Sequence, residues 1–224
     1  MGADTGTGSG SVPKSRGWTR RRLRRDTGRA MSQPTVQSVR GVRTAVAVSE
    51  QHGDRTLDEQ ILVRFPRLVR LALSLWSRLP PRSRLRRIWL ARNIRRGCAA
   101  GNRRDFDLLL LSFDADIEYE SVVGDSSGAL FPDMVGLRRG HAAYRGIWEA
   151  LDEAWDDVKL EHHEVIDFGD RVVALGRVVG RARHTGIPVD QPICQVFMLR
   201  RGVIVRQQDF PERDQALDAV GLRE

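Results

Sequence analysis

The sequence predicts an α+β fold, in which a curved antiparallel sheet packs against helices on one face. Four apolar-rich runs of strand length follow one another in the last third of the chain, at 158–168, 171–184, 189–200 and 203–209. The gaps between them are short, and each holds a glycine, which takes positive φ at low steric cost. We therefore expect a meander of antiparallel hairpins, with the helices predicted before it covering one face.

The charge of the chain is unevenly divided. With 224 residues, of which 41% are hydrophobic, the chain can bury one core and leave tails outside it. Residues 1–104 carry 24 Lys/Arg and 6 Asp/Glu, net +18, whereas residues 105–224 carry 13 Lys/Arg and 23 Asp/Glu, net −10. Any contact with a polyanion is therefore expected from the first hundred residues, and the folded domain is not expected to bind nucleic acid.

Residues 1–56 are rich in Gly, Ser, Thr and Arg and poor in apolar side chains, so we expect a disordered basic tail. The arginine run at 20–25 is not followed by an apolar stretch, so it does not predict an export signal. Cys98 and Cys194 are the only cysteines, and the sequence has no apolar run of 18 residues. These features predict a cytoplasmic protein that does not span a membrane.

Residues 57–80 are predicted to form a cationic amphipathic helix. Apolar side chains recur at helical spacing, and Arg64, Arg67 and Arg70 belong to the opposite stripe. Pro66 should begin or kink this helix, because proline lacks a backbone N–H. Two interpretations are open. The helix can lie peripherally on an anionic membrane through these arginines, or it can pack its apolar face on the domain or on a partner chain.

The folded domain is predicted over residues 84–222, after two consecutive prolines. Helices are recognised by apolar spacing and capping residues, and strands by alternation. In order, the expected elements are a helix from Ser83 to about Ala100, a short helix after Asp105, a strand at 117–123, a loop at 124–140, a helix at 141–155, the four strands, and a closing helix at 211–220.

The period of each element indicates which side chains would line an apolar pocket between sheet and helices. Tyr144 and Trp148 belong to the apolar face of the helix at 141–155. Tyr119 shares a face of the first strand with Ile117. On the last two strands, alternation places Gln195 with Ile193 and Phe197, and Asp209 with Val203, Val205 and Gln207.

The sequence contains four short motifs in this order: Gly101–Asp107, Phe113–Tyr119, Val165–Val173 and Arg201–Arg206. Together they resemble the SnoaL-like branch of the nuclear transport factor two-like superfamily. The resemblance covers roughly residues 84–222 and implies a cone-shaped fold with a pocket at its wide end. It often implies a homodimer packed through the outer face of the sheet. Known functions of the family include polyketide cyclases, ketosteroid isomerases and epoxide hydrolases.

In the SnoaL-type cyclases, a histidine on the penultimate strand and an aspartate near the end of the last strand perform acid–base chemistry. The resemblance places Gln195 and Asp209 at these two positions. A carboxylate among apolar neighbours has a raised pKa, which suits it to abstract a proton next to a carbonyl. Alternatively, Asp209 caps the closing helix. Gln195 cannot carry a proton as imidazole does, although it can orient a substrate carbonyl. Tyr119 can stabilise a developing oxyanion, or it is a core aromatic residue.

The sequence predicts no metal site and no cofactor. His162 and His163 are neighbours on a strand and point to opposite faces, which leaves His162 and Glu164 as only two ligands on one face. No glycine-rich phosphate loop is present. Two classes of function remain for a protein that binds a small apolar molecule. One is an enzyme that uses acid–base chemistry on a carbonyl or epoxide compound. The other is a non-catalytic binding or dimerisation module, attached to a membrane or partner by residues 57–79.

Overall fold

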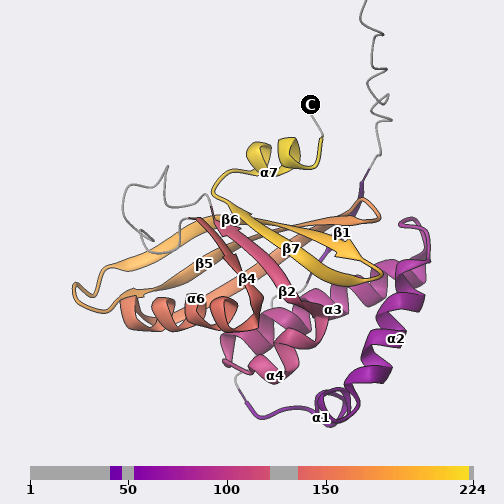
Figure 1. Ribbon diagram of the computed structural model, residues 1–224. Helices are drawn as coiled ribbons and strands as arrows, with labels where there is room; N and C mark the ends of the chain where they lie inside the picture. Colours follow the sequence, from indigo (N-terminus) through magenta and orange to yellow (C-terminus); the bar gives the residue numbers. More distant parts are fainter. Residues whose placement is uncertain (1–40, 47–52, 122–135, 222–224) are drawn as a thin grey trace, which may run out of the picture. The chain divides into compact units, whose positions relative to one another are not determined.

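A computed structural model of the protein describes residues 41–46, 53–121 and 136–221, which belong to a unit that begins at Val36 (Figure 1). The α+β class predicted from the sequence is confirmed. Its elements are β1 (Val42–Ala45), α1 (Leu57–Arg64), α2 (Pro66–Ser77), α3 (Arg84–Asn102), α4 (Phe106–Leu109), a 3-10 turn (Leu110–Ser112), β2 (Phe113–Ser121), β3 (Gly136–Arg139), α6 (Gly140–Ala154), β4 (Trp155–Asp167), β5 (Arg171–Ala182), β6 (Pro188–Arg200), β7 (Val203–Phe210) and α7 (Arg213–Ala219).

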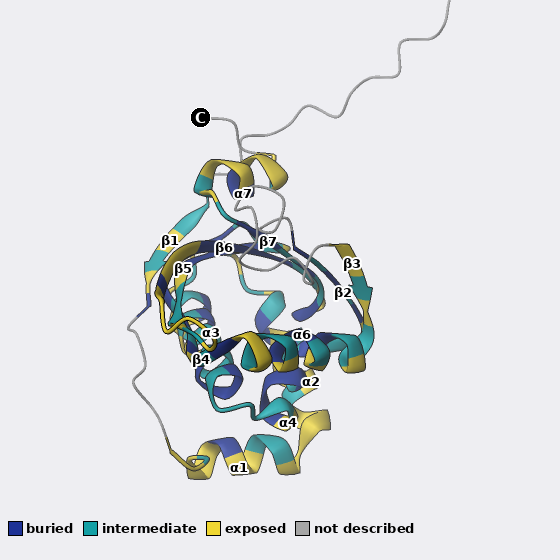
Figure 2. Cartoon of the chain, turned by 90° about the vertical axis from the view of Figure 1, so that its left-hand side faces the viewer, coloured by how far each residue is buried: buried dark blue, intermediate teal, exposed yellow. Residues whose placement is uncertain are grey.

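Seven strands of the described residues form one sheet, in the order β1-β4-β5-β6-β7-β2-β3. β4 to β7 are the predicted antiparallel meander, and β2 joins it by pairing in parallel with β7. Figure 2 shows the sheet as an arch over α3 and α6, with α7 on its outer face. On that outer face, Ala216 and Leu217 of α7 pack with buried side chains of β4 to β7.

Two short edge strands differ from the prediction. The disordered tail predicted over residues 1–56 is wrong at Val42–Ala45, which pair antiparallel with β4. The loop predicted at 124–140 is wrong at Gly136–Arg139, which pair with β2, and residues 124–135 lie outside the described residues. Both strands form hydrogen bonds with backbone groups of β4 and β2 that would otherwise stay unpaired at the edge of the sheet. Local composition does not reveal this pairing, because the partner strands lie elsewhere in the sequence.

Residues 57–79 form two helices rather than one. Phe65 separates α1 from α2, and Pro66 occupies the first position of α2, as its missing N–H predicts. α2 packs on the domain through Leu73 and Trp76, which are 1% and 5% exposed. The indole of Trp76 stacks on Trp89 with the ring centroids 4.6 Å apart. This face of α2 is therefore part of the domain core.

A buried ion pair fastens α2 and α3 to the turn between β4 and β5. Arg86 of α3 and Asp167 of β4 are each 1% exposed, and the guanidinium donates to the two carboxylate oxygens at 2.6 and 2.9 Å. Its other N–H groups donate to the carbonyl oxygens of Ser77, Leu79 and Gly169. All five guanidinium donors thus have a partner, which a buried arginine requires.

Candidate active site

Six buried polar side chains meet on the concave face of the sheet, beneath the arch. Most of the surrounding core is apolar, so hydrogen bonds among these groups are strong, and an unpaired member is costly. They come from five elements: Tyr119 from β2, Tyr144 from α6, His162 from β4, Gln195 from β6, and Gln207 and Asp209 from β7.

A β-bulge decides which side chains of β7 face inward. The pairing of β7 with β6 shifts between Ile204 and Arg206, which makes Val205 the extra residue. Ile204 before the bulge and Gln207 and Asp209 after it all line cavities inside the arch. The prediction that Val203 and Val205 share the face of Asp209 is therefore wrong, because the bulge resets the alternation.

The carboxylate of Asp209 accepts three hydrogen bonds. The Tyr119 hydroxyl donates to Oδ2 at 3.0 Å, and the amide nitrogens of Gln195 and Gln207 donate to Oδ1 at 3.0 and 2.9 Å. Burial raises the pKa of Asp209 to about 6, although the three donors act to lower it. Asp209 does not cap the closing helix, because the N-cap of α7 is Glu212.

Two further hydrogen bonds extend this network. The Tyr144 hydroxyl donates to the Gln207 carbonyl oxygen at 2.9 Å, and Nε2 of His162 lies 2.8 Å from the Gln195 carbonyl oxygen. An amide oxygen can only accept, so His162 carries its proton on Nε2. Burial lowers the pKa of His162 to about 4, so the ring is neutral at pH 7. These five hydrogen bonds therefore all point toward Asp209, directly or through an amide.

The two tyrosines act as hydrogen-bond donors. Burial and the charge of Asp209 raise the pKa of Tyr119 well above its ordinary value, and the same two causes raise the pKa of Tyr144. Their phenols thus stay protonated over the range in which Asp209 changes charge. The site combines one carboxyl that titrates near pH 6 with two hydroxyl groups that do not.

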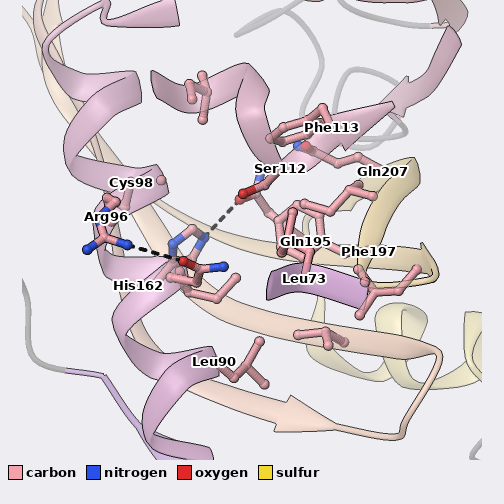
Figure 3. A pocket seen from close by; sticks show the side chains of 18 of the residues that line it. Leu73, Leu90, Arg96, Cys98, Ser112, Phe113, His162, Gln195, Phe197 and Gln207 are labelled. Atoms are coloured by element: carbon pink, nitrogen blue, oxygen red, sulfur yellow. Dashed lines mark hydrogen bonds between the residues drawn. The ribbon is translucent and has the colours of Figure 1, made fainter. Parts of the chain in front are cut away.

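The polar network stands between two cavities. The first cavity has a volume of about 90 Å³ and is lined by His162 and by residues of α2 and α3. The second cavity has a volume of about 60 Å³ and is lined by Tyr119 and Asp209. Figure 3 shows His162 reaching into the first cavity beside the part of α3 that carries Arg96 and Cys98. Both cavities exceed the space one buried water needs, but they are smaller than pockets for drug-sized ligands. Five side chains line both cavities: Tyr144, Trp148, Leu160, Gln195 and Gln207.

The structure brings the three predicted catalytic residues together, since Tyr119 and Gln195 both donate to Asp209. Of the predicted pocket residues, Tyr144 and Trp148 line both cavities, Phe197 lines the first, and Ile193 lines the second. Among the described residues, no group of three His, Cys, Asp or Glu side chains is placed to hold a metal ion.

Two members of the network were not predicted from the sequence as site residues. His162 shares the inward face of β4 with Val158 and Leu160, so the available signal is a lone polar residue in an apolar stripe. Gln207 shares its face with Asp209, which alternation alone indicates. In both cases alternation predicts the face of the sheet on which the side chain lies, but it does not predict the hydrogen-bond partner on another element.

The chain is similar to a known protein family and to several solved structures. Residues 94–207, about half of the chain, match the model of the SnoaL-like domain family. Among solved structures, TerC co-crystallized with polyporic acid is 21% identical over 58% of this chain and 97% of that chain, with a TM-score of 0.46.

Two further solved structures are similar. A ketosteroid isomerase-like protein from Catenulispora acidiphila in complex with trimethylamine is 18% identical over 58% of this chain and 93% of that chain, with a TM-score of 0.45. An NTF2-like protein from Burkholderia thailandensis is 23% identical over 59% and 96%, with a TM-score of 0.46. No curated protein matches the sequence. The family match shows that the chain belongs to the SnoaL-like domain family.

Proposed function

We propose that this protein binds a small, largely apolar molecule beneath the arch and performs acid–base chemistry on it, with Asp209 as the base. The observation that supports this most strongly is a buried carboxyl whose pKa is raised to about 6, beside an apolar cavity. Such a carboxyl is ionised at pH 7 yet readily takes up a proton, as general base catalysis requires. A carboxyl at its ordinary pKa would be a much weaker base.

The donors around Asp209 suit a carbonyl substrate. A carbonyl oxygen that enters the second cavity would compete with Asp209 for the Tyr119 hydroxyl. Loss of that hydrogen bond makes Asp209 more basic, while Tyr119 stabilises the oxyanion that forms as the α-proton moves to the carboxylate. Asp209 then returns the proton to carbon or oxygen, which completes an isomerisation or allows a cyclisation. Gln195 keeps the carboxylate oriented.

The same pair of groups suits an epoxide. Asp209 would take a proton from the attacking water, and the Tyr119 hydroxyl would donate to the epoxide oxygen as the C–O bond breaks. Both reactions need one base and one donor on opposite sides of the reacting atoms. The chemistry proposed is therefore proton transfer, with a ketone, lactone or epoxide as the class of substrate.

Isotope exchange tests the proposal without a known substrate. The protein is incubated in D₂O with a panel of small aryl ketones, and deuterium incorporation at the α-carbon is measured; a lactone and epoxide panel is assayed for turnover. We expect Asp209→Asn to lower the rate at least about 100-fold, and the exposed control Asp218→Asn on α7 to leave it unchanged. Equal rates for Asp209→Asn and the unchanged protein would overturn the assignment.

A second function, attachment to an anionic membrane, is favoured by α1 and α2. Arg64, Arg67 and Arg70 are exposed beside a set of large apolar side chains. Exposed apolar groups flanked by arginines are typical of helices that lie in a lipid interface. Among the described residues, no helix is both long and apolar enough to cross a membrane. The apolar set, each member 50–78% exposed, comprises Leu57, Ile61, Phe65, Leu68, Leu71 and Leu75.

Flotation with liposomes tests the membrane proposal. Removing residues 1–80 would also remove the buried Leu73 and Trp76, so surface substitutions are the sharper tool. We expect the chain to float with phosphatidylserine-containing liposomes and not with neutral ones, and Leu68→Ser with Leu71→Ser to abolish the binding. Absence of flotation, or flotation that the double variant does not reduce, would contradict it.

The homodimer implied by the family stays a prediction. α7 already covers part of the outer sheet face through Ala216 and Leu217, so a dimer would use the rest of that face or the exposed side of α1 and α2. Light scattering after size exclusion distinguishes these cases. A mass of two chains that the Leu68→Ser/Leu71→Ser variant halves would assign the apolar set to dimerisation, and a mass of one chain would exclude the dimer.

A further inference from the structure

His162 presents a buried nitrogen that meets no partner. Its side chain is 5% exposed, and Nδ1 has no hydrogen-bond partner among the described residues. The Gln195 carbonyl oxygen fixes the proton on Nε2, which leaves a lone pair on Nδ1. A buried acceptor without a donor is destabilising, because it loses its hydrogen bonds to water and gains none in the protein. Such a group therefore points to a donor that arrives with a ligand.

The first cavity, which His162 lines, has a largely apolar lining. Its other polar side chains are largely occupied: Arg96 pairs with Asp58, and the Cys98 thiol donates to the Leu160 carbonyl oxygen. Nδ1 of His162 is thus a buried acceptor without a partner among the described residues, and aromatic side chains surround the cavity that His162 lines. The aromatic walls are Trp76, Trp89, Phe113, Tyr144, Trp148 and Phe197.

We propose that the first cavity binds a small aromatic molecule that donates a hydroxyl or N–H to Nδ1 of His162. Phenols and N–H heteroaromatics carry both features. The inference goes beyond the proposed function, because His162 lines the first cavity whereas Asp209 and Tyr119 line the second. Gln195 and Gln207 line this cavity as well as the one that holds Asp209, so a ligand anchored at His162 lies against the residues that hold the base.

The wall of this cavity next to α2 comes from outside the part of the chain that matches the family. Leu73 and Trp76 of α2 line it, whereas the family match begins at residue 94. Gly202, in the turn between β6 and β7, permits the close approach of α2, because a Cβ there would lie 2.2 Å from the Leu73 carbonyl oxygen. We therefore expect α2 to limit the size of ligand that fits.

Matched ligand pairs test the proposal. Binding of phenol and of toluene, and of indole and 1-methylindole, is measured by calorimetry with the full chain. We expect the donor-bearing member of each pair to bind about tenfold more tightly, the value of one hydrogen bond. The preference should vanish in His162→Phe and be partly restored in His162→Gln, whose amide offers an acceptor. Equal affinity within each pair, or a preference that His162→Phe retains, would overturn it.

A second measurement uses the unchanged protein and therefore does not require that a variant folds. In the unchanged protein labelled with ¹⁵N-histidine, the Nδ1 resonance of His162 should move upfield when phenol binds and stay in place with toluene. A resonance that does not respond to phenol at saturation would overturn the proposal. Asp209→Asn distinguishes binding at His162 from catalysis by Asp209. If this variant still prefers phenol to toluene, and neither it nor the unchanged protein turns over any substrate, the binding proposal stands and the catalytic proposal fails.

Discussion

His162 and Asp209 belong to one hydrogen-bonded chain, joined by the two ends of a single amide. The Gln195 carbonyl oxygen accepts from His162 at 2.8 Å, and its nitrogen donates to Asp209 at 3.0 Å. Where the family resemblance leads one to expect a histidine, this chain has the amide, and a histidine lies on β4 instead. The amide cannot relay a proton in its stable form, so it fixes the direction of both partners.

The first prediction concerns the pH dependence of stability. Burial raises the pKa of Asp209 from 3.8 to about 6, so between these pH values the folded chain holds a proton that the unfolded chain has released. Its contribution to stability falls as pH rises through this window. Burial lowers the pKa of His162 from 6.5 to about 4, so the contribution of His162 rises over nearly the same window. The two trends should largely cancel in the unchanged protein.

Two variants expose these trends. We compare each variant with the unchanged protein as the pH rises from 4 to 6.5. Over this range the free energy of unfolding of Asp209→Asn should increase relative to that of the unchanged protein, and that of His162→Gln should decrease, each by up to about 3 kcal/mol. Urea denaturation at several pH values measures the free energy of unfolding. Subtracting the pH profile of the unchanged protein from that of each variant removes the contribution of the surface carboxylates, because all three proteins share them. Identical pH profiles for the three would contradict the assigned pKa shifts.

The second prediction concerns Arg86, whose removal leaves Asp167 buried and unpaired. We expect Arg86→Met to lower the free energy of unfolding by about 3–5 kcal/mol, the typical cost of breaking a buried pair. Arg92→Met is the matched control on the same helix. Its pair with Asp58 is exposed, so the expected loss is below about 1 kcal/mol. If both variants lose equally little, the ion pair does not fasten α3 to the sheet.

The third prediction concerns Tyr119. Tyr119→Phe removes a donor from the ionised carboxylate, so the pKa of Asp209 should rise above 6 and the pH profile of isotope exchange should move upward. Tyr144→Phe is the control, because it removes a hydroxyl of the same network but no direct donor to Asp209. Equal movement of the profile in both variants would mean that Tyr119 has no special relation to Asp209.

The fourth prediction concerns the contact between α2 and the turn that joins β6 to β7. Gly202 has φ +79°, and an added Cβ would collide with the Leu73 backbone, whereas Gly186 has φ +67° and open space around it. Gly186→Ala should lower the free energy of unfolding by roughly 1–3 kcal/mol, because it adds backbone strain alone. Gly202→Ala should lower it clearly more, because it adds the collision with Leu73 as well. Chemical denaturation gives both values, and phenol binding reports on the cavity. Equal losses would show that α2 does not rest on this turn.

The sequence predicts the meander well, because glycine-containing gaps between apolar runs are local signals. It also predicts Pro66 at the start of α2 and Ser83 at the N-cap of α3, for the same reason. The bulge at Val205 and the strand at Val42–Ala45 depend on partners distant in the sequence, so alternation and composition misplace them. The role of His162 was missed because its partner, Gln195, lies on another strand.

The proposed chemistry requires that burial makes Asp209 a base near neutral pH. The most direct test is an NMR titration of its carboxyl carbon, assigned by comparison with Asp209→Asn. We expect a midpoint near pH 6, well above the ordinary value of 3.8. A midpoint below pH 4 would contradict it, because the three hydrogen-bond donors would then outweigh burial and leave a stable, weakly basic carboxylate.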